Sequence, residues 1–315
     1  MKLYKLIFLV LAIGITSCRN STSGQQVYNT IPMYGEVPKS DEIKKIDDDF
    51  RKECLKEYKT LDSSVNVQIY FGWSYYYHDT LKTAMKRFNQ AWLLNPEFPD
   101  SYFGFAALLE TQGNKKDADR FYKLGMEKDT KKDRAEICLG KIADIKEHLK
   151  DIKGAIDAHK RIVEINPNNS LAFKKIGFLS DQIGDTATAL LGYNKAIELD
   201  PTDAMTYNNR AYFYQVKKNY SAAITDYTKA IEIDSKYISA YVNRGITEVE
   251  MNNNLAAKKD FEVCVQLDSK DAGLRRFLGL AKLNLKDKSG ACQDFQLARQ
   301  LGDPQAAELI KQNCK

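Results

Sequence analysis

The sequence predicts an all-α protein built as a solenoid of helical hairpins. Three observations predict this fold: the chain repeats itself with a period of 34 residues, one position of every copy is alanine, and each copy holds two amphipathic helical patterns. In the copy at 205–236 the two patterns meet at the polar turn Lys217-Lys218-Asn219. Self-similarity at this period indicates a repeat array, in which each hairpin buries its apolar face against its neighbours.

Seven copies of the repeat follow one another between residues 65 and 305. Successive copies start 34 residues apart, except that the third starts 37 residues after the second. The predicted repeats are 65–98, 99–135, 136–169, 170–203, 204–237, 238–271 and 272–305. Each hairpin needs a neighbour to cover its apolar face, so the repeats are expected to stack in chain order.

Positions of constant size within each copy indicate how its two helices pack. Position 20 is always alanine: Ala84, Ala118, Ala155, Ala189, Ala223, Ala257 and Ala291. Position 8 is always glycine or alanine: Gly72, Ala106, Ala143, Gly177, Ala211, Gly245 and Gly279. Position 24 carries a ring: Phe88, Tyr122, His159, Tyr193, Tyr227, Phe261 and Phe295. Small residues let antiparallel helices approach to about 8–10 Å, so positions 8 and 20 are expected at the contact and position 24 beside it.

Small residues at positions 8 and 27, alanine at 20, an aromatic at 24 and proline at 32 resemble the tetratricopeptide repeat family. The resemblance covers residues 65–305 and implies a right-handed superhelix of helix-turn-helix repeats that acts as a non-enzymatic scaffold for protein–protein interaction. Copy three departs most from the pattern, with His159 and Ile162 at positions 24 and 27. Its additional residues lie at 130–134, where we expect a joint in the superhelix.

The start of the chain predicts export. Lys2 and Lys5 precede an apolar run that ends at Ile15 and is too short for a stable membrane span, so residues 1–17 are predicted to be a signal peptide. The residues up to Cys18 resemble the lipobox of bacterial lipoproteins, which implies that Cys18 is acylated and anchors the protein to a membrane. The alternative is an ordinary secretory signal peptide in which Cys18 occurs by chance and is not acylated.

A flexible tether is predicted over residues 18–39, which are polar, contain Pro32 and Pro38 and show no sustained period. Its root-mean-square reach is roughly 26 Å. No acidic residue follows Cys18 directly, whereas surface-export signals of some Bacteroidetes-like lipoproteins are acidic there and retention in an inner membrane favours Asp. The expected location is therefore the periplasmic side of an outer membrane, with the cell surface as the alternative.

A helix is predicted over 40–62, ahead of the first repeat. Ser40 can cap it, and Asp41 and Glu42 in its first turn favour the helix dipole. One stripe of the helix is apolar at spacings of three and four: Ile43, Ile46, Phe50, Cys54, Tyr58 and Leu61. We expect this helix to cover the open end of the first repeat, because the terminal faces of solenoids need capping.

Repeat one contains the densest aromatic run of the chain, at 70–77, with Trp73 and Tyr77 four residues apart on one helix face. One interpretation is a stacking platform for a sugar or a peptide, and the sugar gives the alternative function, a glycan- or peptidoglycan-binding envelope lipoprotein. The other is packing beneath the N-terminal helix, because the ends of solenoids bury aromatics for stability and no convergent polar set accompanies these.

No catalytic, metal or cofactor site is predicted. Neither His78 nor His148 has a zinc-ligand partner four residues on, and His159 occupies the ring position of its repeat. No phosphate-binding loop, nucleophile elbow or HExxH stretch occurs. Without Lys2 and Lys5 the chain has 45 basic and 42 acidic residues, a net charge of +3. This near balance argues against nucleic acid, and no small-molecule substrate is expected.

A C-terminal capping helix is predicted over 304–315, with Pro304 at its first position. Cys292 lies ten residues before Gly302, and Cys314 lies ten residues after Pro304. Both cysteines therefore stand about 15 Å from the same turn, on antiparallel helices. We expect a disulfide between Cys292 and Cys314, which an exported location permits.

The family resemblance implies that positions 2, 5, 6, 9, 12 and 13 form a concave wall. In repeats four to six this gives a peptide-binding groove of Lys174, Lys175, Phe178, Met205, Asn208, Asn209, Tyr212, Asn243 and Ile246. The predicted occupant is a peptide or helix of a partner protein, bound partly by the amides of Asn209 and Asn243; bridging of neighbouring helices by these amides is the alternative. Lys174 and Asn209 match the two-carboxylate clamp of chaperone-binding members. Phe178, Ser239 and Asn243 do not, so an acidic chain terminus is not the expected ligand.

Overall fold

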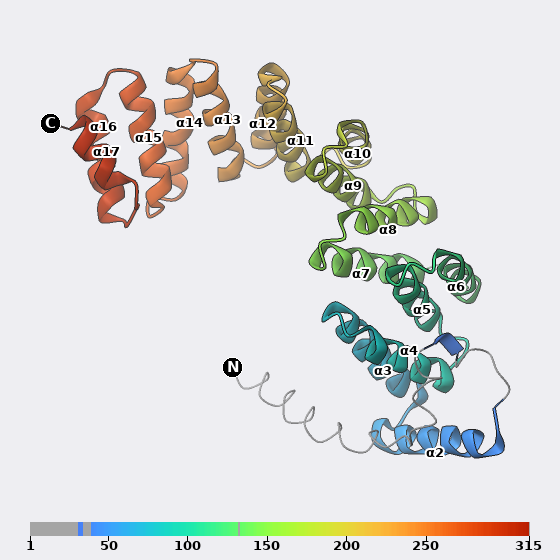
Figure 1. Cartoon of the computed structure of the whole chain (residues 1–315). Coiled ribbons are helices and arrows are strands. Elements are labelled where there is room, and N and C mark those ends of the chain that lie inside the picture. Colours follow the sequence, from blue (N-terminus) through green and yellow to red (C-terminus); the bar gives the residue numbers. More distant parts are fainter. Residues whose placement is uncertain (1–30, 34–38, 132, 315) are drawn as a thin grey trace. The chain divides into compact units, whose positions relative to one another are not determined.

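The computed structural model describes residues 31–33, 39–131 and 133–314. Within these ranges it holds sixteen helices and no strand, so the fold is all-α (Figure 1). The predicted signal peptide, Cys18 and most of the predicted tether lie outside the described residues. None of the helices in the described ranges is long and apolar enough to span a membrane.

The helices form two compact units, divided between Pro167 and Asn168. The first unit contains α2 (Asp41–Tyr58), α3 (Leu61–Tyr77), α4 (Leu81–Leu94), α5 (Pro99–Thr111), α6 (Lys115–Lys128), α7 (Arg134–His148) and α8 (Ile152–Ile165). The second contains α9 (Ser170–Gln182), α10 (Thr186–Leu199), α11 (Ala204–Val216), α12 (Tyr220–Ile233), α13 (Ile238–Glu250), α14 (Asn254–Leu267), α15 (Ala272–Asn284), α16 (Lys288–Gln300) and α17 (Ala306–Asn313). The first unit thus carries three of the predicted hairpins and the second carries four.

The boundary between the units follows repeat three, whereas the sequence predicted a joint before it. Hydrogen bonds fix the connection from α6 to α7 at the place where the joint was predicted. The carboxylate of Asp129 accepts hydrogen bonds from the backbone N–H groups of Arg134 and Ala135, at 3.0 and 2.7 Å. The guanidinium of Arg134 donates two more to Asp100 on α5, at 2.8 and 2.6 Å. These bonds hold the start of α7 against α5, so the longer connection does not loosen the stack.

The hairpin cores follow the pattern of small and aromatic positions. All seven alanines of position 20 are fully buried, and all seven rings of position 24 are buried, including the packed His159. A Cβ added to Gly72 would lie 2.6 Å from the Phe88 ring, and one added to Gly177 would lie 2.8 Å from Tyr193. In these two hairpins the ring of the B helix therefore rests on the small residue of the A helix, as predicted.

The turns inside the hairpins share one geometry. Lys218 has a left-handed backbone (φ 61°), and the side chain of Asn219 then accepts a hydrogen bond from the N–H of Ala222. Lys150 and Lys286 have φ values of 66° and 64°, and a capping aspartate follows each of them. A left-handed residue followed by an N-cap ends one helix and starts the next within two residues.

Two arginines of the second unit repeat the same ion pair in successive hairpins. Arg210 donates to Asp226 at 2.7 and 2.8 Å and to Asn194 on the preceding B helix at 2.7 Å. Arg244 donates to Asp260 twice at 2.7 Å and to Thr228 on the preceding B helix at 2.9 Å. Each arginine therefore ties its own hairpin to the preceding one.

The N-terminal helix begins as predicted but ends earlier. The Ser40 hydroxyl accepts a hydrogen bond from the N–H of Ile43. The helix stops at Tyr58 because Lys59 is left-handed (φ 66°) and Thr60 caps the next helix. Leu61 therefore belongs to α3, which starts four residues before the predicted repeat.

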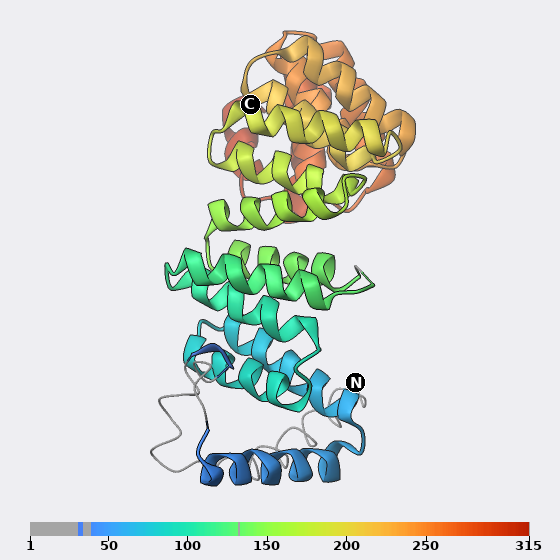
Figure 2. The ribbon, with the colours of Figure 1, turned by 90° about the vertical axis from the view of Figure 1, so that its right-hand side faces the viewer.

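Helix α2 covers the outer end of repeat one (Figure 2). The guanidinium of Arg51 donates to the Leu93 carbonyl at 3.1 and 3.0 Å, and the Ser64 hydroxyl donates to the Cys54 carbonyl at 3.3 Å. Within the predicted tether, residues 31–33 lie against α4, where the Asn89 amide donates to the carbonyl of Ile31 at 2.8 Å. The chain is thus held to the first hairpin on both sides of residues 34–38.

At the other end of the chain a disulfide joins Cys292 on α16 to Cys314 after α17. The Cα atoms are 5.7 Å apart, within the range that a disulfide requires. This is the pair predicted from the level positions of the two cysteines. Arg276 donates to Asp303 at 2.9 Å, which holds the turn before α17 against α15.

Candidate functional site

Five side chains form an exposed apolar face on α9 and α11. Of the predicted groove residues, Phe178 is 42% exposed, and Met205 and Tyr212 are each 51% exposed. Leu171 and Val216, at positions 2 and 13 of the same repeats, are also exposed. Residues seven apart lie on one face of a helix, as do 171 and 178 on α9 and 205 and 212 on α11. We call these five residues the α9–α11 face.

The polar residues of the predicted groove bond mainly to their neighbours. The Lys174 ammonium donates to Asp203 at 2.8 Å, and the side-chain amide of Asn243 donates to Oδ1 of Asn208 at 3.2 Å. Burial raises the pKa of Asp203, but the hydrogen bonds from Lys174 and Thr206 outweigh burial, and the pKa is lowered overall. Asn243 therefore bridges α13 to α11, as the alternative interpretation had it.

The remaining predicted groove residues are less exposed. Ile246 packs against the core cluster formed around Phe261 and Leu278. Lys175 and Asn209 are half-buried. Among the predicted residues, Phe178, Met205 and Tyr212 are thus the ones that offer apolar surface to a partner.

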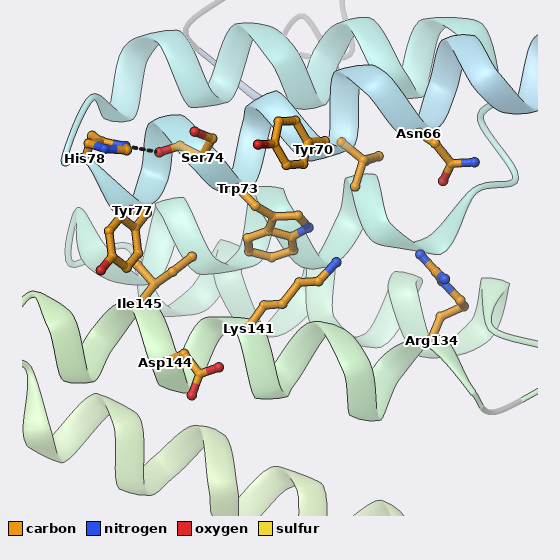
Figure 3. A pocket seen from close by; sticks show the side chains of 11 residues that line it. Asn66, Tyr70, Trp73, Ser74, Tyr77, His78, Arg134, Lys141, Asp144 and Ile145 are labelled. Atoms are coloured by element: carbon orange, nitrogen blue, oxygen red, sulfur yellow. Dashed lines mark hydrogen bonds between the residues drawn. The ribbon is translucent and has the colours of Figure 1, made fainter. Parts of the chain in front are cut away.

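A second candidate site is a pocket of about 510 Å³ between α3 and α7 (Figure 3). The helix between them in sequence, α5, has small residues at two positions where α3 has aromatic ones. Gly104 and Ala107 stand at positions 6 and 9 of repeat two, whereas Tyr70 and Trp73 occupy these positions in repeat one. Both small residues are buried, and a Cβ added to Gly104 would lie 2.4 Å from the Phe88 ring, so this glycine makes room for that ring. Helices α3 and α7 also contact each other directly. We call this space the α3–α7 pocket.

Trp73 and Tyr70 line the α3 side of the pocket. Trp73 is only 6% exposed, and its ring packs edge-on against Phe88 with centroids 5.0 Å apart. Its indole nitrogen is buried and has no hydrogen-bond partner among the described residues. In Figure 3 this nitrogen lies on the side of the ring that faces Lys141 and Arg134. Tyr70, by contrast, is 65% exposed.

Residues of α7 complete the pocket. Lys141 and Asp144 bring opposite charges, and Arg134 lies at the same end as Asn66 (Figure 3). The hydrogen bonds from Arg134 to Asp100 raise the pKa of the guanidinium, which therefore stays charged and paired. The formal charges of the lining are nearly balanced.

The opposite end of the pocket is closed by an aromatic stack. Tyr77 on α3 and His148 on α7 lie with ring centroids 3.9 Å apart and planes at 16°. Tyr77 remains 40% exposed, so its edge still reaches the pocket. The stack joins the C-terminal ends of the two helices.

The aromatic run of repeat one is therefore only partly covered. Trp73 and Tyr76 are buried, but Tyr70 and Tyr77 are exposed, because α2 contacts the outer side of the hairpin instead of this face. The polar residues of α7 were missed in the sequence. The repeat pattern does not indicate them, because they meet α3 only where repeats one and three approach each other.

Comparison with known proteins identifies the repeat. Residues 204–237 match the tetratricopeptide repeat pattern, and the other six copies keep the register of this one. The repeat at 204–237 is a tetratricopeptide repeat. No curated protein matches the sequence.

Solved tetratricopeptide structures share the fold. MamA is 24% identical, with 55% of this chain and 94% of MamA aligned at a TM-score of 0.50. PilF of Pseudomonas aeruginosa is 18% identical, with 58% and 87% of the two chains aligned and a TM-score of 0.50. The C-terminal part of a repeat-containing protein from Cytophaga hutchinsonii is 15% identical, with 76% and 98% aligned and a TM-score of 0.55. At these identities the likeness shows the fold alone. Tetratricopeptide repeats are typically non-enzymatic and serve as scaffolds for protein–protein interaction.

Proposed function

We propose that this protein is a lipid-anchored scaffold on the periplasmic side of an outer membrane, and that it binds a peptide or helix of a partner protein on the α9–α11 face. The observation that carries the proposal is the gathering of five exposed apolar side chains on two successive A helices. Contiguous exposed apolar patches on soluble domains mark interaction sites. The anchor rests on the lipobox-like residues that end at Cys18.

The α9–α11 face is confined to two repeats. At position 2, Leu171 and Met205 are followed by Ser239 and Gly273 in the next repeats. At position 9, Phe178 and Tyr212 are followed by Ile246, which is packed against the core. A short amphipathic helix or an extended segment with a few apolar anchors suits a face of this size.

The proposal predicts that the exposed anchors carry the binding energy. The triple variant Phe178→Ala, Met205→Ala, Tyr212→Ala should lose at least about 30-fold in affinity, because removing apolar anchors at the centre of an interface costs about 2 kcal/mol or more. The partner is first identified by crosslinking in the native envelope and mass spectrometry, and its affinity is then measured with purified proteins. Circular dichroism should be unchanged, since all three side chains are exposed.

A matched control removes exposed apolar side chains elsewhere in the same unit. Leu191 on α10 and Leu255 on α14 are both exposed and lie outside the α9–α11 face. The double variant Leu191→Ala, Leu255→Ala should bind the partner like the wild type. Undiminished binding by the triple variant, or equal loss in the control, would refute the assignment of this face.

The anchor gives a separate prediction. Cys18→Ala should move the protein from the outer-membrane fraction to the soluble periplasmic fraction, because acyl chains on this cysteine are its proposed membrane attachment. Intact mass of the wild-type protein should show a diacylglycerol-modified N-terminal cysteine. A variant that stays with the membrane through a high-salt wash would contradict lipid anchoring, whatever the result for the α9–α11 face.

A further inference from the structure

Trp73 is the side chain in the α3–α7 pocket that most clearly needs a ligand. The indole N–H is buried without a hydrogen-bond partner among the described residues, and a donor left in this state is costly. The contacts of the ring with Phe88 and Tyr76 fix its orientation. A ligand that places an oxygen acceptor beside this nitrogen would satisfy it.

The exposed ring of Tyr70 supplies an apolar platform next to that donor. Most of its surface is open, whereas one face of Tyr77 is covered by His148. An exposed aromatic face favours a flat ligand with aliphatic C–H groups on one side. The polar end of such a ligand would lie over the lining residues of α7.

The polar lining offers both donors and acceptors with little net charge. Lys141 donates and the carboxylate of Asp144 accepts, while Asn66 and Ser74 do both. Arg134 already balances Asp100 through two hydrogen bonds. A neutral ligand with many hydroxyl groups matches this set better than an ion of either sign.

We propose that the α3–α7 pocket binds a neutral saccharide of one or two rings, stacked on Tyr70 with a hydroxyl oxygen accepting the hydrogen bond of Trp73. The pocket volume lies within the usual range for small ligands. The Tyr77–His148 stack closes one end, which suits a short ligand more than a chain passing through. A purely apolar ligand would leave the indole N–H unsatisfied. This site is separate from the α9–α11 face and does not depend on it.

Nuclear magnetic resonance of the indole groups tests the proposal directly. The chain has two tryptophans, so ¹⁵N-labelled protein gives two indole N–H signals, and Trp92→Phe assigns the one from Trp73. The probes are cellobiose, maltose and N,N′-diacetylchitobiose. At least one should shift the Trp73 signal downfield in a saturable way, with a dissociation constant on the order of 1 mM, while the Trp92 signal stays in place.

Two variants separate binding from folding. Tyr70→Ala removes an exposed platform and should abolish the saccharide shift while the Trp73 signal remains dispersed. Trp73→Phe removes the donor and should weaken binding measured by calorimetry by about tenfold. Tyr212→Ala, on α11, is the matched control and should bind the saccharide like the wild type. The proposal is overturned if none of the probes shifts the Trp73 signal, if Tyr70→Ala leaves the shift unchanged, or if a peptide and not a saccharide saturates the pocket.

Discussion

Replacing Arg244 by alanine is expected to lower the free energy of unfolding by about 3–5 kcal/mol. Arg244 and Asp260 are mostly buried, and the variant leaves the Asp260 carboxylate without its cation. It also removes the hydrogen bond that Arg244 donates to the Thr228 hydroxyl, so α13 loses a contact with the preceding B helix. Urea unfolding followed by circular dichroism measures the loss.

Two comparisons show whether the buried charge is the cause. Lys229→Ala breaks an exposed ion pair with Glu232 in the same unit and should cost less than about 1 kcal/mol. The double variant Arg244→Met, Asp260→Leu removes both charges and should be more stable than Arg244→Ala alone. If the double variant were the less stable of the two, an unpaired Asp260 carboxylate would not be the cause of the loss.

The loss of stability in the Arg244→Ala variant should depend on pH, and its sign follows from the pKa of Glu248. Burial and the nearby Asp260 raise the pKa of Glu248 from 4.5 to about 7, and Arg244 opposes this shift. The folded chain thus holds a proton that the unfolded chain releases between these values, and stability falls as pH rises through that window. Without Arg244 the charged form of Glu248 is less favourable still. Glu248 is charged at a pH of about 8 and protonated at about 5, so Arg244→Ala should lower the free energy of unfolding more at the higher pH.

Removing the disulfide is expected to lower the stability of the C-terminal hairpin by about 3 kcal/mol. The bond between Cys292 and Cys314 closes a loop across a sequence separation of 22, and closure restricts the unfolded chain. The double variant Cys292→Ser, Cys314→Ser should show this loss in urea. Because α16 packs mainly against α15 and α17, hydrogen exchange should rise mainly in these three helices.

Reductant provides the control for the disulfide. Dithiothreitol should lower the urea midpoint of the wild type to that of the double variant and leave the double variant unchanged. The described free cysteines, Cys54, Cys138 and Cys264, are buried and form no disulfide. A wild-type midpoint that does not respond to complete reduction would contradict a stabilising role for the bond.

The exposed residues of the candidate sites could be predicted only in part. The register of the repeats placed Phe178, Met205 and Tyr212 on one side of their helices, because residues seven apart share a helix face. Whether a polar side chain there bonds to a ligand or to a neighbour depends on the distance between helices. Asn243 reaches Asn208 on α11, and Lys174 reaches Asp203, which the sequence pattern does not encode.

The sequence by itself determined the repeat, the hairpin cores and the disulfide pair. Alanine at position 20 and a ring at position 24 decide local packing within one hairpin, and equal distances from one turn decide which cysteines meet. Only the tertiary structure decided the division after Pro167, the early end of α2 and the α3–α7 pocket. The pocket is lined by Trp73 of repeat one and Lys141 of repeat three, although repeat two lies between them in the sequence. Such a site depends on the approach of helices that are not adjacent in sequence, and no periodicity along one helix specifies it.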